Sequence, residues 1–558
     1  MRLAFALFLS AAMLHAAPFD TLVDDFFTNA YFKFQPTAGT QAGLHQYDSQ
    51  LEDYSRKVMV DAQGASLRKY EAELLKIDPA TLDPYARGDR QMLLNYIHAT
   101  LLSLHDIRYW ESNPDIYSSG ITQSAFYIMS RQFAPQPDRL RTLIAREKQM
   151  PRVFDEARAN LKNPPKVFVD IAIEQMPGNI SFFEHDIPQA FTKVTDKQLL
   201  AEFQLSNAAV AQAMKSYEAW LKSDLLPRAH GDFRLGAENY RKKLEYEEMV
   251  DTPLDRLLAI GYEDLRRNQQ RFREVAAKID PKRTPRQILD EAEKDHPPSN
   301  KLLQAFRDVL GGLRDYIEQH HIVTIPSQVM PIVEETPPFA RALTFASMDT
   351  PGAYEKVAKE AFFNVTLPEP KWTPAQIEQH LESFNRGIVN SIAIHEAFPG
   401  HYVQFLWVQR LPSKTRKLLY ANSNVEGWAH YCEQMMLDEG YAAADLKLRL
   451  GQLQDALLRD ARYIVGIEMH TGKMTMEQAI DFFVKEGMQV RATGERETKR
   501  GTSDPTYLYY TLGKLEIMKL RQDYHQPILK FHDEFMKQGG APIRIVREAM
   551  LGNHSPVL

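Results

Sequence analysis

Residues 387–404 read GIVNSIAIHEAFPGHYVQ, and they carry the strongest signal in the sequence. At their centre His395 and Glu396 are adjacent, and His401 follows after four further residues. In the common His-Glu-x-x-His motif, two histidines four residues apart bind zinc from one helix face, and the glutamate acts as a base. The stretch therefore predicts a related metal site with a longer spacing.

That longer spacing is incompatible with one unbroken helix. Residues six apart on an α-helix lie about 120° apart around its axis, whereas residues four apart lie about 40° apart. Pro399 and Gly400 fall between the two histidines. Proline removes an N–H that would bond back within the helix, and glycine tolerates unusual backbone angles. We therefore predict a loosened turn that brings His401 back toward His395.

A second segment, NVEGWAH at residues 424–430, offers a third ligand from another helix. Glu426 is the first choice, since a glutamate often completes such a site. His430 lies one helical turn later on the same face, so it is the alternative third ligand. On residues alone the competing interpretation is that the paired histidines belong to an ordinary core.

Apolar residues recur at intervals of three and four through most of the remaining chain, which predicts a mainly α fold. Helices are expected at 67–104 (broken near Pro79 and Pro84), 138–161, 198–226, 253–279 and 300–321. Short β-rich pieces predict a small sheet beside the motif helix, at 322–326, 329–333, 342–346 and 362–367. A charged, glycine-containing stretch over 491–505 is expected to be a loop.

The length of 558 residues corresponds to three or four domains by size alone. No clear linker divides them. We place a weak boundary near residue 240, between an N-terminal helical lobe (18–240) and a catalytic lobe (241–558) that holds the sheet and the motifs. The two lobes are allowed to interlock.

The N-terminus has the layout of a secretory signal peptide over residues 1–17. Arg2 gives a positive start, residues 3–14 are almost wholly apolar, and two alanines precede Pro18. Spanning a bilayer takes about 20 apolar residues, so this run is too short. No cysteine follows it, and we expect a periplasmic or secreted protein without a stable membrane anchor.

The composition excludes several classes of protein. Acidic residues number 73 and basic residues 67, which gives no general reason to expect nucleic acid as a partner. The single cysteine, Cys432, excludes an internal disulfide, a Cys-rich zinc finger and an iron–sulfur cluster. A buried structural thiol is the expected state of that residue.

The string HEAFPGHYVQ at 395–404 resembles the signature of the bacterial proteins grouped as domain of unknown function 885. Further matching strings are EGWAHY at 426–431, Ala461-Arg462 followed by His470, EQAI at 477–480 and YTLGKL at 510–515. The resemblance covers most of the mature chain and is dense between about 340 and 525. It implies a zinc peptidase-like protein, with a helical architecture and deep cleft similar to angiotensin-converting enzyme and the thermostable carboxypeptidases.

This resemblance and the residue pattern together give each site residue an expected role. His395, His401 and Glu426 would bind one zinc ion per chain and leave a fourth position open, as in catalytic zinc sites. Glu396 would be the general base. The resemblance implies that Tyr510 and His470 stabilise the oxyanion that develops during amide hydrolysis.

Several further residues are expected to support the site. Glu433 is a candidate to orient an imidazole, with an ordinary surface acid as its alternative. Arg462, Arg500 and Lys514 are candidates to hold a substrate carboxylate, and each of them has an ordinary structural role as its alternative. By analogy, the strand over 362–366 would pair with an extended peptide substrate.

The leading expectation is an exported zinc-dependent metallopeptidase that hydrolyses short peptides, with carboxypeptidase- or dipeptidase-like action. One alternative is a metal-dependent amidase acting on non-protein amides, because the chemistry at the carbonyl is the same. Another is a non-catalytic binding protein that retains the fold. The presence of Glu396 argues against a decayed site.

Overall fold

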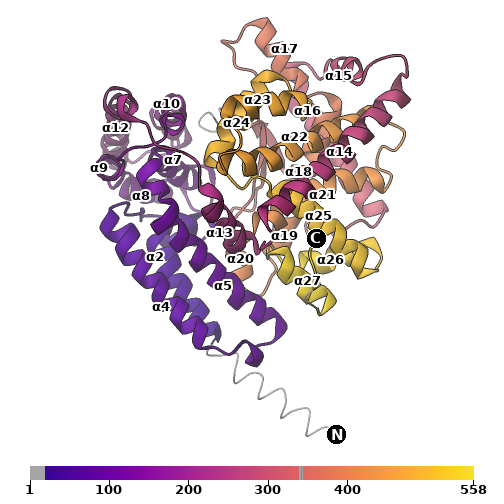
Figure 1. Ribbon diagram of the computed structural model, residues 1–558. Coiled ribbons are helices and arrows are strands. Elements are labelled where there is room, and N and C mark those ends of the chain that lie inside the picture. Colours follow the sequence, from indigo (N-terminus) through magenta and orange to yellow (C-terminus); the bar gives the residue numbers. More distant parts are fainter. Residues whose placement is uncertain (1–18, 338–340, 342–343, 554) are drawn as a thin grey trace. The chain divides into compact units, whose positions relative to one another are not determined.

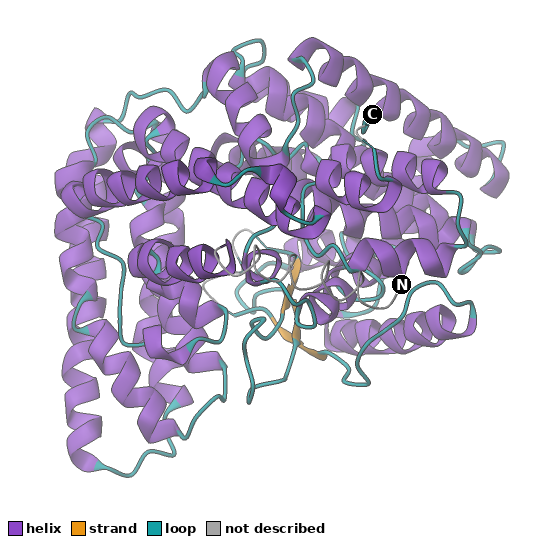
Figure 2. Cartoon of the chain, turned by 90° about the horizontal axis from the view of Figure 1, so that it is seen from below, coloured by secondary structure: helices purple, strands orange, loops and turns teal. Residues whose placement is uncertain are grey.

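The computed structural model describes residues 19–337, 341, 344–553 and 555–558 (Figure 1). Over these residues the chain is mainly helical with one small sheet, as predicted (Figure 2). The predicted signal peptide lies outside the described residues. None of the described helices combines the length and the apolar character needed to cross a membrane.

The chain divides into two compact units, and the division after Phe233 lies close to the predicted boundary at 240. Unit 1 contains the chain up to Phe233 and two later segments, Pro351–Lys359 and Leu411–Leu419. Unit 2 contains Arg234–Thr350, Glu360–Arg410 and Tyr420–Leu558. The chain therefore returns to unit 1 twice after leaving it.

Unit 1 is built from helices. They are α2 (Phe32–Phe34), α3 (Pro36–Gln41), α4 (Gln63–Lys76), α5 (Pro84–Leu102), α6 (Tyr109–Ser112), α7 (Asp115–Ser130), α8 (Gln136–Glu147), α9 (Met150–Asn160), α10 (Lys166–Ser181), α11 (Ile187–Ala190), α12 (Lys197–Trp220) and α20 (Lys414–Leu418). The break expected near Pro84 is confirmed, because Asp83 caps α5 by accepting the N–H groups of Tyr85 and Ala86.

The helix predicted over 138–161 is wrong in one respect, because two helices form there instead of one. The first, α8, ends at Glu147, and α9 begins at Met150. Pro151 is the second residue of α9, where its missing N–H costs no helical hydrogen bond. In the middle of a continuous helix the same proline would remove a bond and clash with the preceding turn.

Buried charges attach the two returning segments to unit 1. Arg416, on α20, is fully buried, and its Nε donates to Oδ1 of Asp89 at 2.7 Å. The guanidinium carbon also lies 3.6 Å from the centre of the Tyr85 ring. In the other segment Glu355 lies 3.0 Å from Nε2 of His45, whose Nδ1 lies 2.9 Å from Asp48.

Unit 2 holds the remaining helices and the sheet. They are α13 (Gly236–Glu248), α14 (Leu254–Ile279), α15 (Pro285–Glu293), α16 (Leu302–Gln319), β1 (Ile332–Glu335), β2 (Ala346–Asp349), β3 (Phe362–Val365), α17 (Pro374–Glu382), α18 (Arg386–Glu396), α19 (His401–Val408), α21 (Asn422–Asp438), α22 (Leu446–His470), α23 (Met476–Lys485), α24 (Arg491–Ser503), α25 (Tyr509–Tyr524), α26 (Ile528–Met536) and α27 (Ile543–Leu551).

The core of unit 2 lies between α14 and α22, which run alongside each other (Figure 1). Apolar side chains at helical spacing fill this interface, and α13, α15 and α25 add to it. Its buried members include Tyr240, Leu257, Leu265, Phe272, Leu453, Leu457, Ile464 and Leu512. This packing fixes α22 and α25, which both carry residues of the site described below.

The small sheet has the strand order β1–β3–β2. β3 pairs with β1 in parallel and with β2 in antiparallel orientation. The suggestion that the strand over 362–366 pairs with a substrate is therefore wrong, because both edges of β3 are already used. Of the other expected strands, 322–326 forms none. In the piece over 342–346, residues 342 and 343 lie outside the described residues, and Ala346 is the first residue of β2.

Most of the stretch 491–505 is a helix, α24 (Arg491–Ser503), so the predicted loop there is wrong. Its Arg, Glu and Lys residues are good helix formers, and Arg491 pairs with Glu495 one turn later at 2.9 Å. One of the two glycines in this stretch, Gly494, is buried: a Cβ there would lie 3.1 Å from the carbonyl oxygen of Ile480. Close packing explains this glycine without a turn.

Candidate metal centre

The helix is interrupted between the two histidines, as the Pro-Gly pair predicts. Helix α18 ends at Glu396, and α19 begins at His401. Gly400 donates its N–H to the carbonyl oxygen of Ile394 at 3.0 Å. A Cβ at Gly400 would lie 1.8 Å from the carbonyl oxygen of His395, so only glycine fits this approach. The break turns the chain so that both imidazoles face one point.

A second close approach sets the position of α21. A Cβ on Gly513, in α25, would lie 1.8 Å from the carbonyl oxygen of Ser423, and Gly427 packs against the same glycine. The first N–H groups of α21 are capped by Glu248, whose Oε2 accepts from Ser423 at 2.8 Å. These contacts fix the register of α21 and the direction in which Glu426 points.

The structure brings His395, His401 and Glu426 together around one point. Oε2 of Glu426 lies 3.2 Å from Nε2 of His395 and 3.4 Å from Nε2 of His401. The two imidazole rings are nearly perpendicular, with centres 4.8 Å apart. Potential ligand atoms of the two histidines and Glu396 all lie within 4.8 Å of one another.

These distances fit a zinc ion. Ligand atoms about 2.0–2.1 Å from a tetrahedral zinc lie roughly 3.3–3.4 Å from one another. Among the residues that the structure describes, Oε2 of Glu426 is buried without a hydrogen-bond partner of good geometry, despite its closeness to both imidazoles. A buried carboxylate oxygen in this state costs free energy that a cation would recover.

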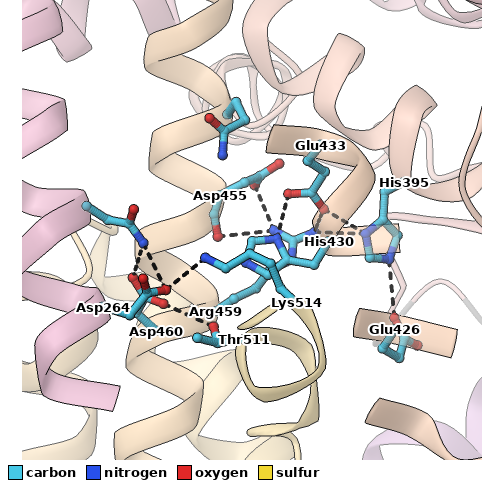
Figure 3. Close-up of polar contacts among 12 residues, drawn as sticks. Asp264, His395, Glu426, His430, Glu433, Asp455, Arg459, Asp460, Thr511 and Lys514 are labelled. Carbon is cyan, nitrogen blue, oxygen red and sulfur yellow. Dashed lines mark hydrogen bonds and ion pairs between the residues drawn. The ribbon is translucent and has the colours of Figure 1, made fainter. Parts of the chain in front are cut away.

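Glu433 orients the first histidine from behind (Figure 3). Its Oε1 lies 2.7 Å from Nδ1 of His395 and forms an ion pair with Nη2 of Arg459 at 2.8 Å. A second acid, Asp455 on α22, contacts the same guanidinium at 3.6 Å. The contact at Nδ1 places the proton of a neutral His395 there and leaves Nε2 free to bind a metal.

His430 occupies a different position from Glu426. Its Nδ1 lies 3.0 Å from Oε2 of Glu433, and its side chain is completely buried. Nε2 of His430 has no hydrogen-bond partner among the described residues. The geometry thus favours Glu426 as the third ligand and gives His430 a place behind it, against the carboxylate that orients His395.

The charged groups of this site favour protonated imidazole at the place where a cation would bind. Burial alone would lower the pKa of His395, but contacts with Glu426 and Glu433 raise it to about 9. Burial opposes ionisation of Glu426, yet the two histidines hold its pKa well below the usual range. Metal binding requires neutral imidazoles, so it would release protons from this cluster.

Glu396 and Tyr510 lie beside the same point. Burial raises the pKa of Glu396, and the backbone N–H of Met348 on β2 donates to its carboxylate. The Tyr510 ring stacks on that of His395 with centres 6.1 Å apart, and its hydroxyl receives Nη2 of Arg500 at 3.1 Å. Burial raises the pKa of Tyr510, which keeps the phenol protonated.

His470, which the sequence suggested as a catalytic group, has both ring nitrogens in contact with backbone atoms. Its Nε2 lies 2.7 Å from the carbonyl oxygen of Gly501, and its Nδ1 lies 3.4 Å from the N–H of Leu235. Its ring also packs 6.1 Å from that of Tyr240. These contacts describe a residue that joins elements of unit 2.

All three candidates for a carboxylate clamp already contact acids of this chain, and Arg500 does so by pairing with Asp504 at 3.1 Å. Arg462 binds both oxygens of Glu497, at 2.7 and 3.0 Å. Lys514 lies 2.8 Å from Asp264 in a buried network that also contains Asp460 (Figure 3). Cys432 is fully buried, which raises its pKa and agrees with a structural thiol.

Sequence reasoning missed Arg459, Asp455 and Arg496. Arg459 and Asp455 are four residues apart on α22, so their pairing could have been found from helical spacing. Their distance from the motif along the chain hid their contact with Glu433. Arg496 lies in the stretch that was expected to be a loop, and only the helix reveals its position.

The comparisons agree with this fold. A solved structure described as a "putative lipoprotein of unknown function" from Shewanella oneidensis has a TM-score of 0.78 at 26% identity, over 96% of this chain and 99% of its own. A "putative lipoprotein" from Colwellia psychrerythraea has a TM-score of 0.80 at 18% identity, over 97% and 99%. No curated protein matches the chain. The family model described as "Bacterial protein of unknown function (DUF885)" matches residues 36–550, so the chain belongs to this family.

Proposed function

We propose that this chain is an exported, zinc-dependent metallopeptidase that hydrolyses amide bonds in short peptides. The observation that carries the proposal is the spacing of three ligand atoms, 3.2 and 3.4 Å from Oε2 of Glu426 to Nε2 of His395 and His401. Three protein ligands with an open fourth position are typical of catalytic zinc sites. The relatives described as lipoproteins support export of the fold.

A zinc ion held by these residues would supply a bound water with a pKa near 7 and polarise the substrate carbonyl. Glu396 is the group that moves the proton. Its carboxylate lies beside both imidazoles, where it would accept a proton from the attacking water and pass it to the amine that leaves. The N–H of Met348 holds this carboxylate in place.

Tyr510 is placed to stabilise negative charge on the substrate oxygen. Arg500 donates to the phenol oxygen, so the phenol proton remains available to a second acceptor. The contact also puts positive charge next to the phenol and favours donation to an oxyanion. Substitution of Tyr510 with Phe would remove this donor and keep the ring against His395.

The test compares zinc-loaded wild type and Glu396→Gln on a library of short fluorogenic peptides. The variant keeps the proposed ligands, so we expect unchanged zinc content and a loss of turnover of about 10²–10⁴-fold. Glu439→Gln, at the end of α21 and paired with Arg521, is the matched control and should keep full activity. Equal turnover in the Glu396 variant, or no turnover of any peptide by zinc-loaded wild type, would contradict the proposal.

A further inference from the structure

Three arginines lie against the Tyr510 ring, each with an acidic partner, and a fourth, Arg496, lies on α24 one turn before Arg500. Arg459 pairs with Glu433, Arg462 with Glu497, and Arg500 with Asp504. Arg496 makes no ion pair and no hydrogen bond with any residue that the structure describes. Helix α24 therefore carries one guanidinium without a direct acidic partner, and the nearby carboxylate of Glu497 is already paired with Arg462.

Arg496 is held in place by packing. Its guanidinium carbon lies 3.8 Å from the centre of the Phe345 ring, and Nη2 is buried without a partner. Arginine cannot lose its proton under ordinary conditions, so this charge persists in the folded protein. Stacking on an aromatic ring compensates part of the cost of desolvation, but a buried unpaired donor still favours an anion.

The side chains of Arg496 and Arg500 share one face of α24, because residues four apart lie one turn apart. Arg500 reaches the hydroxyl of Tyr510, which stacks on His395. Both guanidinium groups also influence the charge of Glu497. The row of positive charge on α24 therefore begins beside the proposed metal ligands and ends at Phe345.

The backbone of β2 and the residue before it runs between Glu396 and Phe345. The N–H of Thr366 donates to the carbonyl oxygen of Phe345, so alternate residues of β2 bond to β3. By this alternation the backbone groups of Ala346 and Met348 face away from β3. The N–H of Met348 donates to Glu396, while Phe345 lies under Arg496.

We propose that the outer edge of β2 and the guanidinium of Arg496 form a subsite for the C-terminal carboxylate of a peptide substrate. The peptide would run antiparallel to β2, with the bond to be cleaved near Glu396 and its C-terminus at Arg496. This proposal rests on the proposed peptidase function and names its substrate class: short peptides with a free C-terminus.

The strand geometry also limits the length of the released fragment. Met348 lies three steps along the chain from Phe345, and a strand advances about 3.3 Å per step, which gives about 10 Å. A peptide lying along this edge would cover the distance with two or three residues. The fragment released from the C-terminus is therefore expected to be a dipeptide or tripeptide.

The same guanidinium would also accept the side-chain carboxylate of an acidic residue. The test therefore uses three N-acetylated probes: tetraalanine as the free acid, tetraalanine as the amide, and an amide in which glutamate replaces the last alanine. Affinity is measured by calorimetry on the zinc-loaded Glu396→Gln protein, where slow turnover leaves binding visible. Arg496→Gln in this background removes the charge, and Arg491→Gln, an exposed position on the same helix, is the control.

We expect the free acid to bind at least about tenfold more tightly than the simple amide, with the preference lost in Arg496→Gln and kept in Arg491→Gln. Equal affinity for acid and amide, or a preference that survives Arg496→Gln, would overturn the proposal. Equal binding of the glutamate amide and the free acid would overturn its assignment to the C-terminus. If wild type cleaves peptides but shows no preference for the free acid, the subsite is contradicted and the peptidase function is not. If the protein prefers the free acid but wild type cleaves no peptide, the peptidase function is contradicted and the carboxylate subsite is not.

Discussion

Nδ1 of His395 lies 2.7 Å from Oε1 of Glu433, and both side chains are buried. The other oxygen of this carboxylate contacts His430, and Arg459 holds it from a third side. Because three groups fix Glu433, its carboxylate in turn fixes the orientation of the imidazole. Nε2 of His395 is then directed at Glu426.

Glu433→Gln should weaken zinc binding by about 10–100-fold without removing a ligand. Residues that orient a ligand typically contribute this much to metal affinity. The amide keeps the shape of the carboxylate but removes the charge that pairs with Arg459. Competition with a chelator of known affinity measures the effect, and Glu439→Gln is the control. Unchanged affinity in a folded Glu433→Gln protein would show that the contact does not orient the ligand.

Arg416→Met should destabilise the protein by about 3–5 kcal/mol, as expected when one partner of a buried ion pair is removed. The carboxylate of Asp89 would remain buried without its charged partner, Arg416, and would keep its contact with Ser413. Urea unfolding of wild type and variant measures the difference. The double variant Arg416→Met with Asp89→Asn should recover part of it. A loss below 1 kcal/mol in the single variant would contradict the role given to this pair.

His45 should make stability depend on pH. Burial would lower its pKa, but Asp48 and Glu355 raise it above the ordinary value of 6.5. Since the folded pKa is the higher one, the folded state holds the proton more tightly than the unfolded state. The stabilisation is complete below about pH 6.5 and is lost as the pH rises through the folded pKa.

The measurement is the melting temperature across this range for wild type and His45→Gln. The difference between the two proteins should be largest at pH 6 and should shrink toward pH 8.5. His230→Gln, which removes an exposed histidine of unit 1, is the matched control. A His45 difference that stays constant, or grows with pH, would contradict the contact network.

Local sequence signals predicted most of the helices because each depends on spacing and capping within one segment. The break between His395 and His401 was predictable for the same reason, since the Pro-Gly pair lies inside the interval. The failure over 491–503 has a physical cause: Gly494 resembles a turn residue but is a site of close packing. Packing between distant segments leaves no trace in local periodicity.

The candidate ligands could be named from sequence because their residue types are rare in apolar helices. Glu433 could be named as a candidate to orient an imidazole, with a surface acid as its alternative. Arg459 and Arg496 could not be named, because they resemble surface charges on helices. Only the fold shows that Glu433 is buried against His395 and that Arg496 stacks on Phe345. The order of β1, β3 and β2 was equally hidden, and it makes β1 and β2 the edge strands of the sheet.

Zinc content by mass spectrometry is the most direct test of the proposed centre, measured on wild type, His401→Ala, Glu426→Gln and His430→Gln after reconstitution with zinc. We predict about one zinc per wild-type chain, strong loss in His401→Ala and Glu426→Gln, and retention in His430→Gln. Melting curves identify any variant that fails to fold. A wild-type protein that takes up no zinc, or a Glu426→Gln protein that binds it fully while His430→Gln loses it, would contradict the metal centre described here.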